Sequence, residues 1–345
     1  MTTRFRSFCN FLLMIVVCIP PALFVFNLRQ NCPSSAPTED FSMTELLRRW
    51  FESAPSGFTA APAPILCETY RSNPNLCVNL LYFVVVDVGF YIIYLCQGST
   101  WLIDPHWQLI PVCIAFFFFT HPDASGVAAT RHPRSWLSLG LLLIWAARLM
   151  HNYLRREEWQ FGGREDWRYA DMRQAHGRWW MVSQFGAVCL AQHAMLVGLT
   201  LPLAPAMSAD GAALNAVDVI ACTLCAAGIA IGYVADKQLH TYMQFDRSKK
   251  PLVLDTGLWR YSRHPNHFGE QCWWIGVLLL GLSSHSHSHY IAFGVLFNHP
   301  LDTFVTLRLI EDRMLRRPER VRAFRAYQER TSLLVPWFPS GSKKK

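Results

Sequence analysis

Long uninterrupted apolar runs constrain this chain more than any other feature of its sequence. A helix needs about 20 mostly apolar residues to cross a bilayer, and in hydrocarbon its backbone must satisfy its own hydrogen bonds. The runs do not alternate as barrel strands do, so we predict an all-α, polytopic integral membrane bundle with about seven to eight transmembrane helices. The runs are residues 11–28, 76–96, 136–150, 179–204, 214–235 and 290–307, with shorter ones at 107–120 and 271–283.

Basic residues are unevenly distributed among the segments that join these runs. Residues 148–178, 236–270 and 308–345 hold seven, six and eleven of the 32 Lys and Arg residues, whereas 205–213 and 284–289 hold none. The positive-inside rule places such basic segments in the cytosol. Eight spans would then put both termini there too, and we expect the membrane of the endoplasmic reticulum. The net charge of +8 is explained by topology, so no nucleic-acid partner is predicted.

Four regions are predicted along the chain. Residues 1–28 resemble a signal peptide or signal anchor, and we favour a retained anchor because no clear cleavage site follows the apolar run. Residues 29–75 are rich in Pro, Ser and Ala and read as a loop. Cys32, Cys67 and Cys77 lie in or near it and leave a lumenal disulfide open. Residues 76–339 are predicted to form one membrane domain, and residues 340–345 a basic tail.

No metal site is predicted. Cys222 and Cys225 form a CxxC without a second pair at zinc spacing. The His-Ser alternation at 285–289 fits no closed zinc pattern, so we expect a polar lumenal turn there.

Polar residues crowd two basic segments beside apolar helices, residues 148–180 and 255–274. Ionisable residues at such positions are costly unless paired, so they suggest a site. The second segment reads DTGLWRYSRHPNHFGEQCWW. Arginine offers a rigid fork for phosphate, the N–H groups of a helix start add donors, and tryptophan can stack on a planar ligand. This combination is typical of a nucleotide site, without specifying the nucleotide.

The same segment carries a family resemblance. Its RYSRHPNHFGE string resembles the membrane reductase superfamily of steroid 5α-reductases and sterol C14 and C7 reductases. Within that group the chain most resembles the branch defined by a domain of unknown function with a 3-oxo-5α-steroid 4-dehydrogenase-like C-terminal region. The likeness covers roughly residues 76–339. It includes REDWRYADMR at 164–173, ADKQLH at 235–240, LIEDRML at 309–315 and YQERTSLLVPWF at 327–338.

The resemblance implies an NADPH pocket that opens to the cytosol and hydride transfer to an activated C=C bond of a lipophilic, enone-like substrate. Asn266 and Glu270 match the superfamily's NxxGE/D pattern, and Arg263 begins the RHP form. The cofactor-binding residues implied in this way are Asp236, Arg260, Tyr261, Arg263, His264, Asn266, His267, Gly269, Glu270, Trp274, Arg308 and Glu311.

Such a reaction also needs a group that donates a proton to the substrate carbonyl. Asp87, Tyr91 and Asp104 are the candidates in the N-terminal half, with Tyr94 beside them. Burial of Asp87 in an apolar run favours its neutral donor form, although helix packing, or helix capping for Asp104, also accounts for these acids. Arg148, Asn152 and Tyr169 are expected to gate the substrate or to contact the cofactor.

Two departures limit the resemblance. His267 stands where the branch usually has Tyr, and the N-terminal half lacks the Gln/Glu and Tyr pair that polarises the ketone in steroid reductases, so steroid specificity does not follow. Isoprenylcysteine carboxyl methyltransferases are a rival, because they are similar in fold and carry an RHPxYxG motif that helps bind S-adenosylmethionine. Asn266 and Glu270 look more like the reductases. A non-catalytic lipid-binding membrane protein is the third alternative, and the oligomeric state stays open.

Overall fold

The computed structural model is helical throughout, apart from turns, loops and one isolated bridge between Ser262 and Ser332, which confirms the all-α prediction for the described part of the chain. Contacts divide the chain into two compact units. The first unit comprises Met1–Ala129 and Glu157–Val197, and the second comprises Thr130–Arg156 and Gly198–Lys345. The structure describes residues 3–32, 64–72, 74–120, 132–207, 213–246, 250–284 and 289–340.

Six helices of the described residues are long and apolar enough to cross a membrane, which supports an integral membrane protein. The predicted spans at 271–283 and 290–307 are helical but are not among the six, so the count of seven to eight is not confirmed. Glu270 adjoins the first of these runs, and Asp302 lies within the second. The six are Arg4–Asn31, Cys77–Gln97, Ile103–Thr120, Pro133–Arg156, Trp167–Ala206 and Ala216–Gln244.

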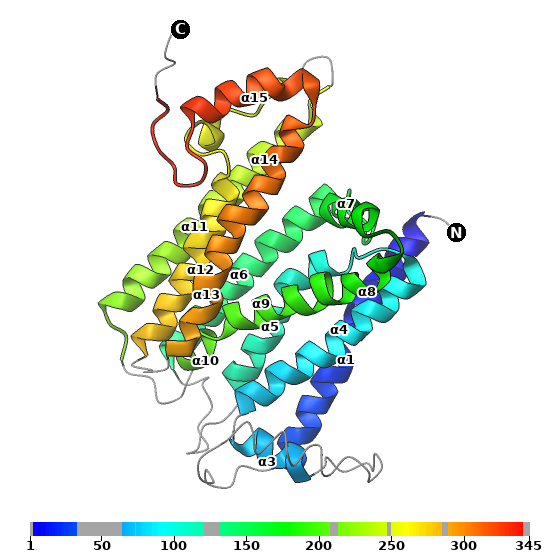
Figure 1. The fold of residues 1–345 in the computed structure, drawn as a ribbon. Helices are drawn as coiled ribbons and strands as arrows, with labels where there is room; N and C mark the ends of the chain where they lie inside the picture. The colour runs from blue at the N-terminus through cyan, green and yellow to red at the C-terminus, as the bar shows by residue number, and fades with distance from the viewer. Residues whose placement is uncertain are drawn as a thin grey trace. The chain divides into compact units, whose positions relative to one another are not determined.

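The first unit is built on three long helices, α1 (Thr3–Asn31), α4 (Pro74–Gln97) and α5 (Ile103–Thr120) (Figure 1). A disulfide between Cys32 and Cys67 joins the end of α1 to the short α3 (Pro64–Ser72), and it is one of the pairings that the three cysteines allow. The rest of the unit is one helical run with changing pitch. It consists of α7 (Trp167–His176), η2 (Gly177–Trp179), α8 (Trp180–Gln184), the π-helical η3 (Phe185–Leu190) and the start of α9 (Ala191–Thr200).

The second unit is centred on α6 (Pro133–Arg156), α11 (Ala216–Gln244) and α12 (Pro265–Ser283). A capping box formed by Asn215 and Asp218 fixes the start of α11, and Pro265 occupies the first turn of α12, where its missing N–H costs nothing. The remaining elements are α10 (Leu203–Ala206), η4 (Gly257–Arg260), η5 (His289–Ala292), α13 (Phe293–Leu301), η6 (Asp302–Thr306), α14 (Leu307–Leu315) and α15 (Pro318–Arg330).

Helices α11 and α12 approach closely because small residues line their contact. A Cβ atom on Gly269 would lie 2.6 Å from the carbonyl oxygen of Gly228, and a Cβ on Gly276 would lie 2.9 Å from that of Ala221. Gly228 and Gly232 have the GxxxG spacing that lets helix backbones meet inside a membrane. This contact holds the ADKQLH and RYSRHPNHFGE motifs side by side.

Several predictions concern residues outside the described ranges. They include residues 285–288 of the polar turn, residues 341–345 of the basic tail and most of the loop at 29–75.

Candidate functional site

Arg148, a buried arginine on α6, is the centre of a polar cluster in the second unit. Its Nη2 donates to Oδ2 of Asp236 on α11 at 2.7 Å, and its Nη1 donates to Oε1 of Glu270 on α12. Trp145, one turn earlier on α6, donates from Nε1 to Oε2 of Glu270 at 3.0 Å. Three helices therefore meet at one group of charges. Its two carboxylates outnumber its single guanidinium.

The glycines of α11 and α12 explain why a full arginine fits here. A Cβ on Gly232 would overlap the Arg148 guanidinium, so the glycine leaves room for this side chain in its observed position. Gly269, which the family resemblance implies as a cofactor contact, packs against Gly228 and Gly232 of α11. Its contact with a cofactor stays a prediction.

Three buried polar atoms beside the cluster have no hydrogen-bond partner among the described residues. They are Nε of Arg148, Oδ1 of Asn266 and Nε1 of Trp273. Asn266, Glu270 and Trp273 are spaced i, i+4 and i+7, which places them on one face of α12. The Trp273 ring stacks on Trp145, with centroids 5.4 Å apart and planes 8° from parallel. We call the donors and acceptors of Trp145, Arg148, Asn266, Glu270 and Trp273 the Arg148 strip.

The predicted Trp274 is buried at the edge of this strip. Its ring meets Trp145 edge-on, with centroids 5.1 Å apart, so it packs within the protein. Asn152, predicted at the substrate entrance, lies one turn beyond Arg148 on α6 and accepts a hydrogen bond from Arg155 at 3.1 Å.

Arg263 and His264 take part in a second cluster, centred on Glu311 of α14. Nε of Arg263 donates to Glu311 Oε1 at 2.7 Å, and Nη1 donates to the carbonyl oxygens of Gln328 and Thr331. His264 Nε2 lies 3.2 Å from the same carboxylate oxygen, and Gln328 donates to Oε2 at 2.7 Å. These contacts fasten α14 and the end of α15 to the RHP motif. The motif therefore holds the C-terminal segment in place. We call Arg263, His264, Glu311 and Gln328 the Glu311 brace.

Electrostatics in this brace favour one charge state. Burial alone would raise the pKa of Glu311, but hydrogen bonds from His264, Arg263 and Gln328 outweigh it and hold the pKa at about 2. Burial lowers the pKa of His264, although the hydrogen bond to Glu311 opposes that shift. At neutral pH the brace is therefore a carboxylate held by an arginine and a neutral histidine, whose Nε2–H donates to Glu311.

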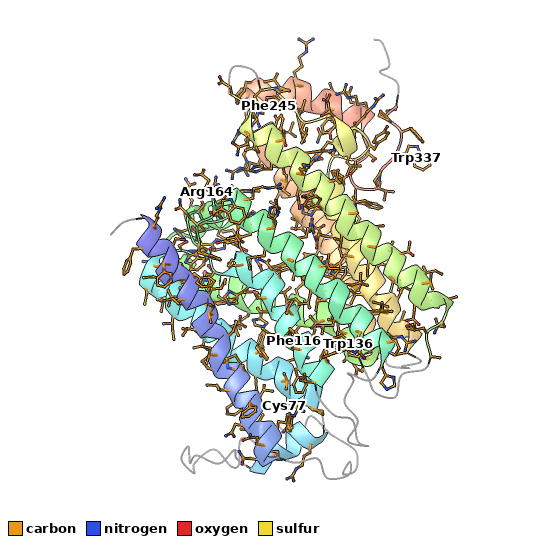
Figure 2. All side chains as sticks on the ribbon, turned by 180° about the vertical axis from the view of Figure 1, so that it is seen from behind. Cys77, Phe116, Trp136, Arg164, Phe245 and Trp337 are labelled. Carbon is orange, nitrogen blue, oxygen red and sulfur yellow. A yellow bond between two sulfur atoms is a disulfide. The ribbon has the colours of Figure 1, made fainter. Side chains whose placement is uncertain are left out.

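The C-terminal segment that follows is tied to the same motif. Trp337 donates its backbone N–H to the carbonyl oxygen of Tyr261 at 2.9 Å, and the Ser332 hydroxyl donates to that oxygen at 2.8 Å. The indole of Trp337 is exposed (Figure 2), as is the ring of Phe338. Tyr261 itself is half-exposed and meets Phe338 edge-on.

His267 has a partner that the sequence did not indicate. Its Nδ1 lies 3.0 Å from Oδ1 of Asp302, the first residue of the π-helical η6, and Gln271 donates to the neighbouring Thr303 hydroxyl at 3.0 Å. Arg260 and Arg308, by contrast, are exposed and pair with no described carboxylate. Their guanidinium groups are available to an anionic ligand.

With this geometry established, comparisons with known proteins give the family. Residues 90–331 match the family described as "Protein of unknown function (DUF1295)". The chain belongs to this DUF1295 family. A Schizosaccharomyces pombe relative, "Uncharacterized protein C594.04c", is 28% identical over 231 residues, which cover 61% of this chain and 66% of the relative, just under two thirds of its length. No solved structure matches the chain. The DUF1295 match includes both the Arg148 strip and the Glu311 brace.

The predicted proton donors lie in the first unit of the DUF1295 chain. Asp87 of α4 is fully buried and lies 2.9 Å from Nδ1 of His193 on α9. The Tyr91 hydroxyl donates to the carbonyl oxygen of Met181 at 3.1 Å. Asp104 lies in the first turn of α5, as expected for a residue near a helix start. The sequence analysis missed His193, although a lone ionisable residue inside an apolar run was a usable signal.

The REDWRYADMR motif is also in the first unit. Glu165 accepts from the backbone N–H and the hydroxyl of Thr100 at 2.8 and 2.7 Å, and Arg173 donates to it at 2.7 Å. The buried Tyr169, predicted at the substrate entrance, accepts a hydrogen bond at its hydroxyl from Gln192. Within the described residues no group of three or more His, Cys, Asp or Glu side chains is placed to hold a metal ion.

Proposed function

We propose that this DUF1295 protein is a membrane-embedded, NADPH-dependent reductase that transfers hydride to an activated C=C bond of a lipophilic substrate, such as an enone. The Arg148 strip is the observation that carries the proposal. It leaves two buried donors and one buried acceptor without partners. Each such atom costs about 1–3 kcal/mol, which a bound ligand recovers.

The strip suits the polar parts of a dinucleotide. Oδ1 of Asn266 can accept from a ribose hydroxyl or a carboxamide, while Nε of Arg148 and Nε1 of Trp273 can donate. The exposed arginines Arg260 and Arg308 suit the phosphates, because a guanidinium fork matches phosphate oxygens. Bound NADPH supplies the hydride. The chain's own residues would hold and orient it and keep its reactive end away from water.

The family motif adds support of a different kind. The NxxGE string at Asn266–Glu270 and the RHP string before it resemble the steroid 5α-reductase superfamily, whose members reduce C=C bonds with NADPH. In that setting the substrate would be a lipid-soluble molecule that enters from the bilayer. We place the protein in the endoplasmic reticulum, with the basic segments and both termini in the cytosol, as part of the proposal.

The test compares NADPH, NADH and S-adenosylmethionine on purified full-length protein in detergent. A ligand at a hundredfold its dissociation constant stabilises the folded state by about 2.7 kcal/mol, which a thermal unfolding scan detects. We expect NADPH to raise the unfolding temperature more than NADH, and S-adenosylmethionine to have no effect. Deuterium from labelled NADPH should then be found in a lipid product when extracts of cells with and without the protein are compared. NADPH binding without deuterium in any product would remove the reductase assignment.

One observation favours a methyltransferase as the second candidate. Asp236 and Glu270 face a single arginine, so the cluster has an excess negative charge. A sulfonium cation such as that of S-adenosylmethionine would be attracted to it. Stabilisation by S-adenosylmethionine, and none by NADPH, would decide for this alternative.

A further inference from the structure

Asp87 and His193 form a hydrogen-bonded pair deep inside the first unit. Both side chains are 0% exposed, and Nδ1 of His193 lies 2.9 Å from Oδ1 of Asp87. Asp87 is the middle residue of the 21-residue candidate span Cys77–Gln97. A hydrocarbon core of about 30 Å then leaves it about 15 Å from either polar surface. An ionisable pair at that depth is costly and marks a functional site by default.

The pair lies in a region where hydrogen-bonding needs are unmet. Oδ2 of Asp87 and Nε2 of His193 are buried without a partner among the described residues, and so are Oε1 of Gln184 and Nε1 of Trp180, one turn apart on α8. Gln184 donates to Sγ of Cys189 at 3.3 Å, and Cys189 lies one turn before His193 on the same helical run.

Another buried histidine of the same unit has hydrogen-bond partners for both of its ring nitrogens. His106 on α5 is also 0% exposed. Its Nδ1 lies 2.9 Å from the carbonyl oxygen of Leu102, and its Nε2 lies 3.6 Å from Sγ of Cys18. The unit thus satisfies both ring nitrogens of one buried histidine and leaves one nitrogen of the other unused. That contrast points to a ligand at His193.

The surroundings indicate what kind of ligand fits. The ring of Phe83 meets the His193 ring edge-on at 5.5 Å, and Val86 and Leu196 are fully buried on the same two helices. The π-helical segment Phe185–Leu190 directly precedes α9, and π-helical turns within α-helices are frequent at functional sites. An apolar region with a few polar atoms suits a lipophilic molecule that carries a single polar group.

Net charge determines which nitrogen holds a proton. A buried pair that carried a full negative charge would be strongly disfavoured in hydrocarbon. When the bridging proton lies between Oδ1 and Nδ1, the neutral pair is either imidazolium with carboxylate or neutral imidazole with carboxylic acid, and in both forms Nε2 of His193 bears a hydrogen. The unpartnered Nε2 is thus a donor, which matches the lone pairs of a carbonyl oxygen.

We infer that the Asp87–His193 pair binds the carbonyl oxygen of a lipophilic molecule such as a long-chain enone, with Nε2 of His193 donating the hydrogen bond. Asp87 acts as a positioning residue, because it holds Nδ1 and so directs Nε2. The whole site lies within the first unit. It needs no cofactor, so it would stand even if the proposed reductase activity failed.

The binding test needs no cofactor. The probe is a cyclohexenone with a long alkyl chain and an isotope-labelled carbonyl, added to full-length protein in lipid nanodiscs. We expect the carbonyl stretching band to move to lower frequency on binding to the wild type and to the control His106→Gln. His193→Phe should abolish this shift, because phenylalanine keeps the ring but has no donor. Absence of a shift in the wild type, or an unchanged shift in a folded His193→Phe variant, would overturn the inference.

A second variant distinguishes a hydrogen-bond donor from a packing residue. His193→Gln keeps an N–H near the position of Nε2, so probe affinity should change by less than about tenfold and part of the carbonyl shift should remain. A loss of the shift in His193→Gln as complete as in His193→Phe would contradict a hydrogen bond from this position. Thermal unfolding of each variant confirms that it is folded.

Discussion

Two buried arginines on α6 pair with the same neighbouring helix, yet they are used differently. Arg134 meets Asp218 near the start of α11, and Arg148 meets Asp236 near its end. In Figure 2, Trp136 lies at the Arg134 end of the second unit and Phe245, just beyond α11, lies at the other end. The two ion pairs have the same chemistry and the same helices, so their surroundings must account for any difference in role.

The Arg134 pair is closed. Its Nε and Nη2 grip both oxygens of Asp218 at 2.7 and 2.8 Å, and Nη2 also donates to the carbonyl oxygen of Ala213. Asp218 further accepts from the Ser283 hydroxyl at 2.6 Å and from the backbone N–H of Asn215 at 2.8 Å. The charges of Arg134 and Asp218 balance, and the same carboxylate caps α11. Such an ion pair stabilises the fold.

The Arg148 pair is open. It includes a second carboxylate, Glu270, whose side chain is 25% exposed, and Nε of Arg148 has no described partner. Asn266, one turn away on α12, also has a buried acceptor without a partner. A cluster with an excess negative charge and with polar atoms that lack hydrogen-bond partners stabilises the fold less than a fully paired one. Its unpaired atoms can still bind a ligand. We therefore assign stability to the Arg134 end and binding to the Arg148 end.

The largest expected effect comes from breaking the closed pair. Arg134→Ala leaves Asp218 buried without its cation, and removal of one partner of a buried ion pair costs about 3–5 kcal/mol. We expect that loss in the free energy of unfolding, measured by denaturation in detergent. NADPH affinity, measured by titration on the folded fraction, should stay at the wild-type value. A loss of affinity as large as that of an Arg148-end variant would contradict the division between the two ends.

The matched change at the open end is Glu270→Gln. Glutamine keeps the shape and can still accept from Trp145, but it loses the charge that holds Arg148 in place. A charge-assisted hydrogen bond is worth about 1.5–3 kcal/mol, so NADPH affinity should fall roughly ten- to a hundredfold. Unfolding should be affected less than in Arg134→Ala, because Glu270 is partly exposed. Asp218→Asn is the control, with lower stability and unchanged affinity. Equal affinity in Glu270→Gln and wild type would make the Arg148 cluster a structural contact as well.

A third buried acid, Glu311, extends the comparison to pH. Its pKa is held at about 2, below the ordinary 4.5, so its contribution to stability is complete above about pH 4.5 and is lost as the pH falls toward 2. Burial lowers the pKa of His264 from 6.5, so stability also begins to fall below that pH. We expect the unfolding temperature of Glu311→Gln to be lower than wild type at neutral pH and to depend less on pH in the acid range.

The control for this experiment is Glu319→Gln, an exposed glutamate on α15. Its unfolding temperature should follow that of the wild type at every pH. If Glu311→Gln also followed the wild-type curve into acid, the brace would not depend on the ionised carboxylate.

The apolar runs were sufficient to predict the helices, because a chain in hydrocarbon has few alternatives. The number of spans was harder to predict, since Glu270 adjoins the run at 271–283 and Asp302 lies within the run at 290–307. The motif resemblance brought Asp236, Asn266 and Glu270 into one predicted site, and the structure places Asp236 and Glu270 on the same arginine.

The partners of these residues could not be predicted in the same way. His193 pairs with Asp87 across 106 positions, and Trp145 donates to Glu270 across 125. Local spacing carries no information about such pairs, because helix packing alone decides which side chains meet. Arg263 shows the same limit. Its residue type suits phosphate, but nothing in the sequence indicated that its guanidinium is engaged by Glu311 and two backbone carbonyls. Its contact with a cofactor stays a prediction.

The smallest expected effect concerns the two exposed arginines, Arg260 and Arg308. Neither pairs with a described carboxylate, so Arg260→Gln and Arg308→Gln should leave the unfolding temperature unchanged. Exposed charges are screened by solvent and salt, so we expect NADPH affinity to fall by about tenfold or less, and the loss to shrink as ionic strength rises. NADH affinity should change less if the arginine contacts the extra phosphate. Arg325→Gln, an exposed arginine on α15, is the control and should bind both nucleotides as the wild type does. If all three variants lost the same salt-dependent affinity, the effect would come from the overall positive charge. No individual arginine could then be assigned to the phosphates.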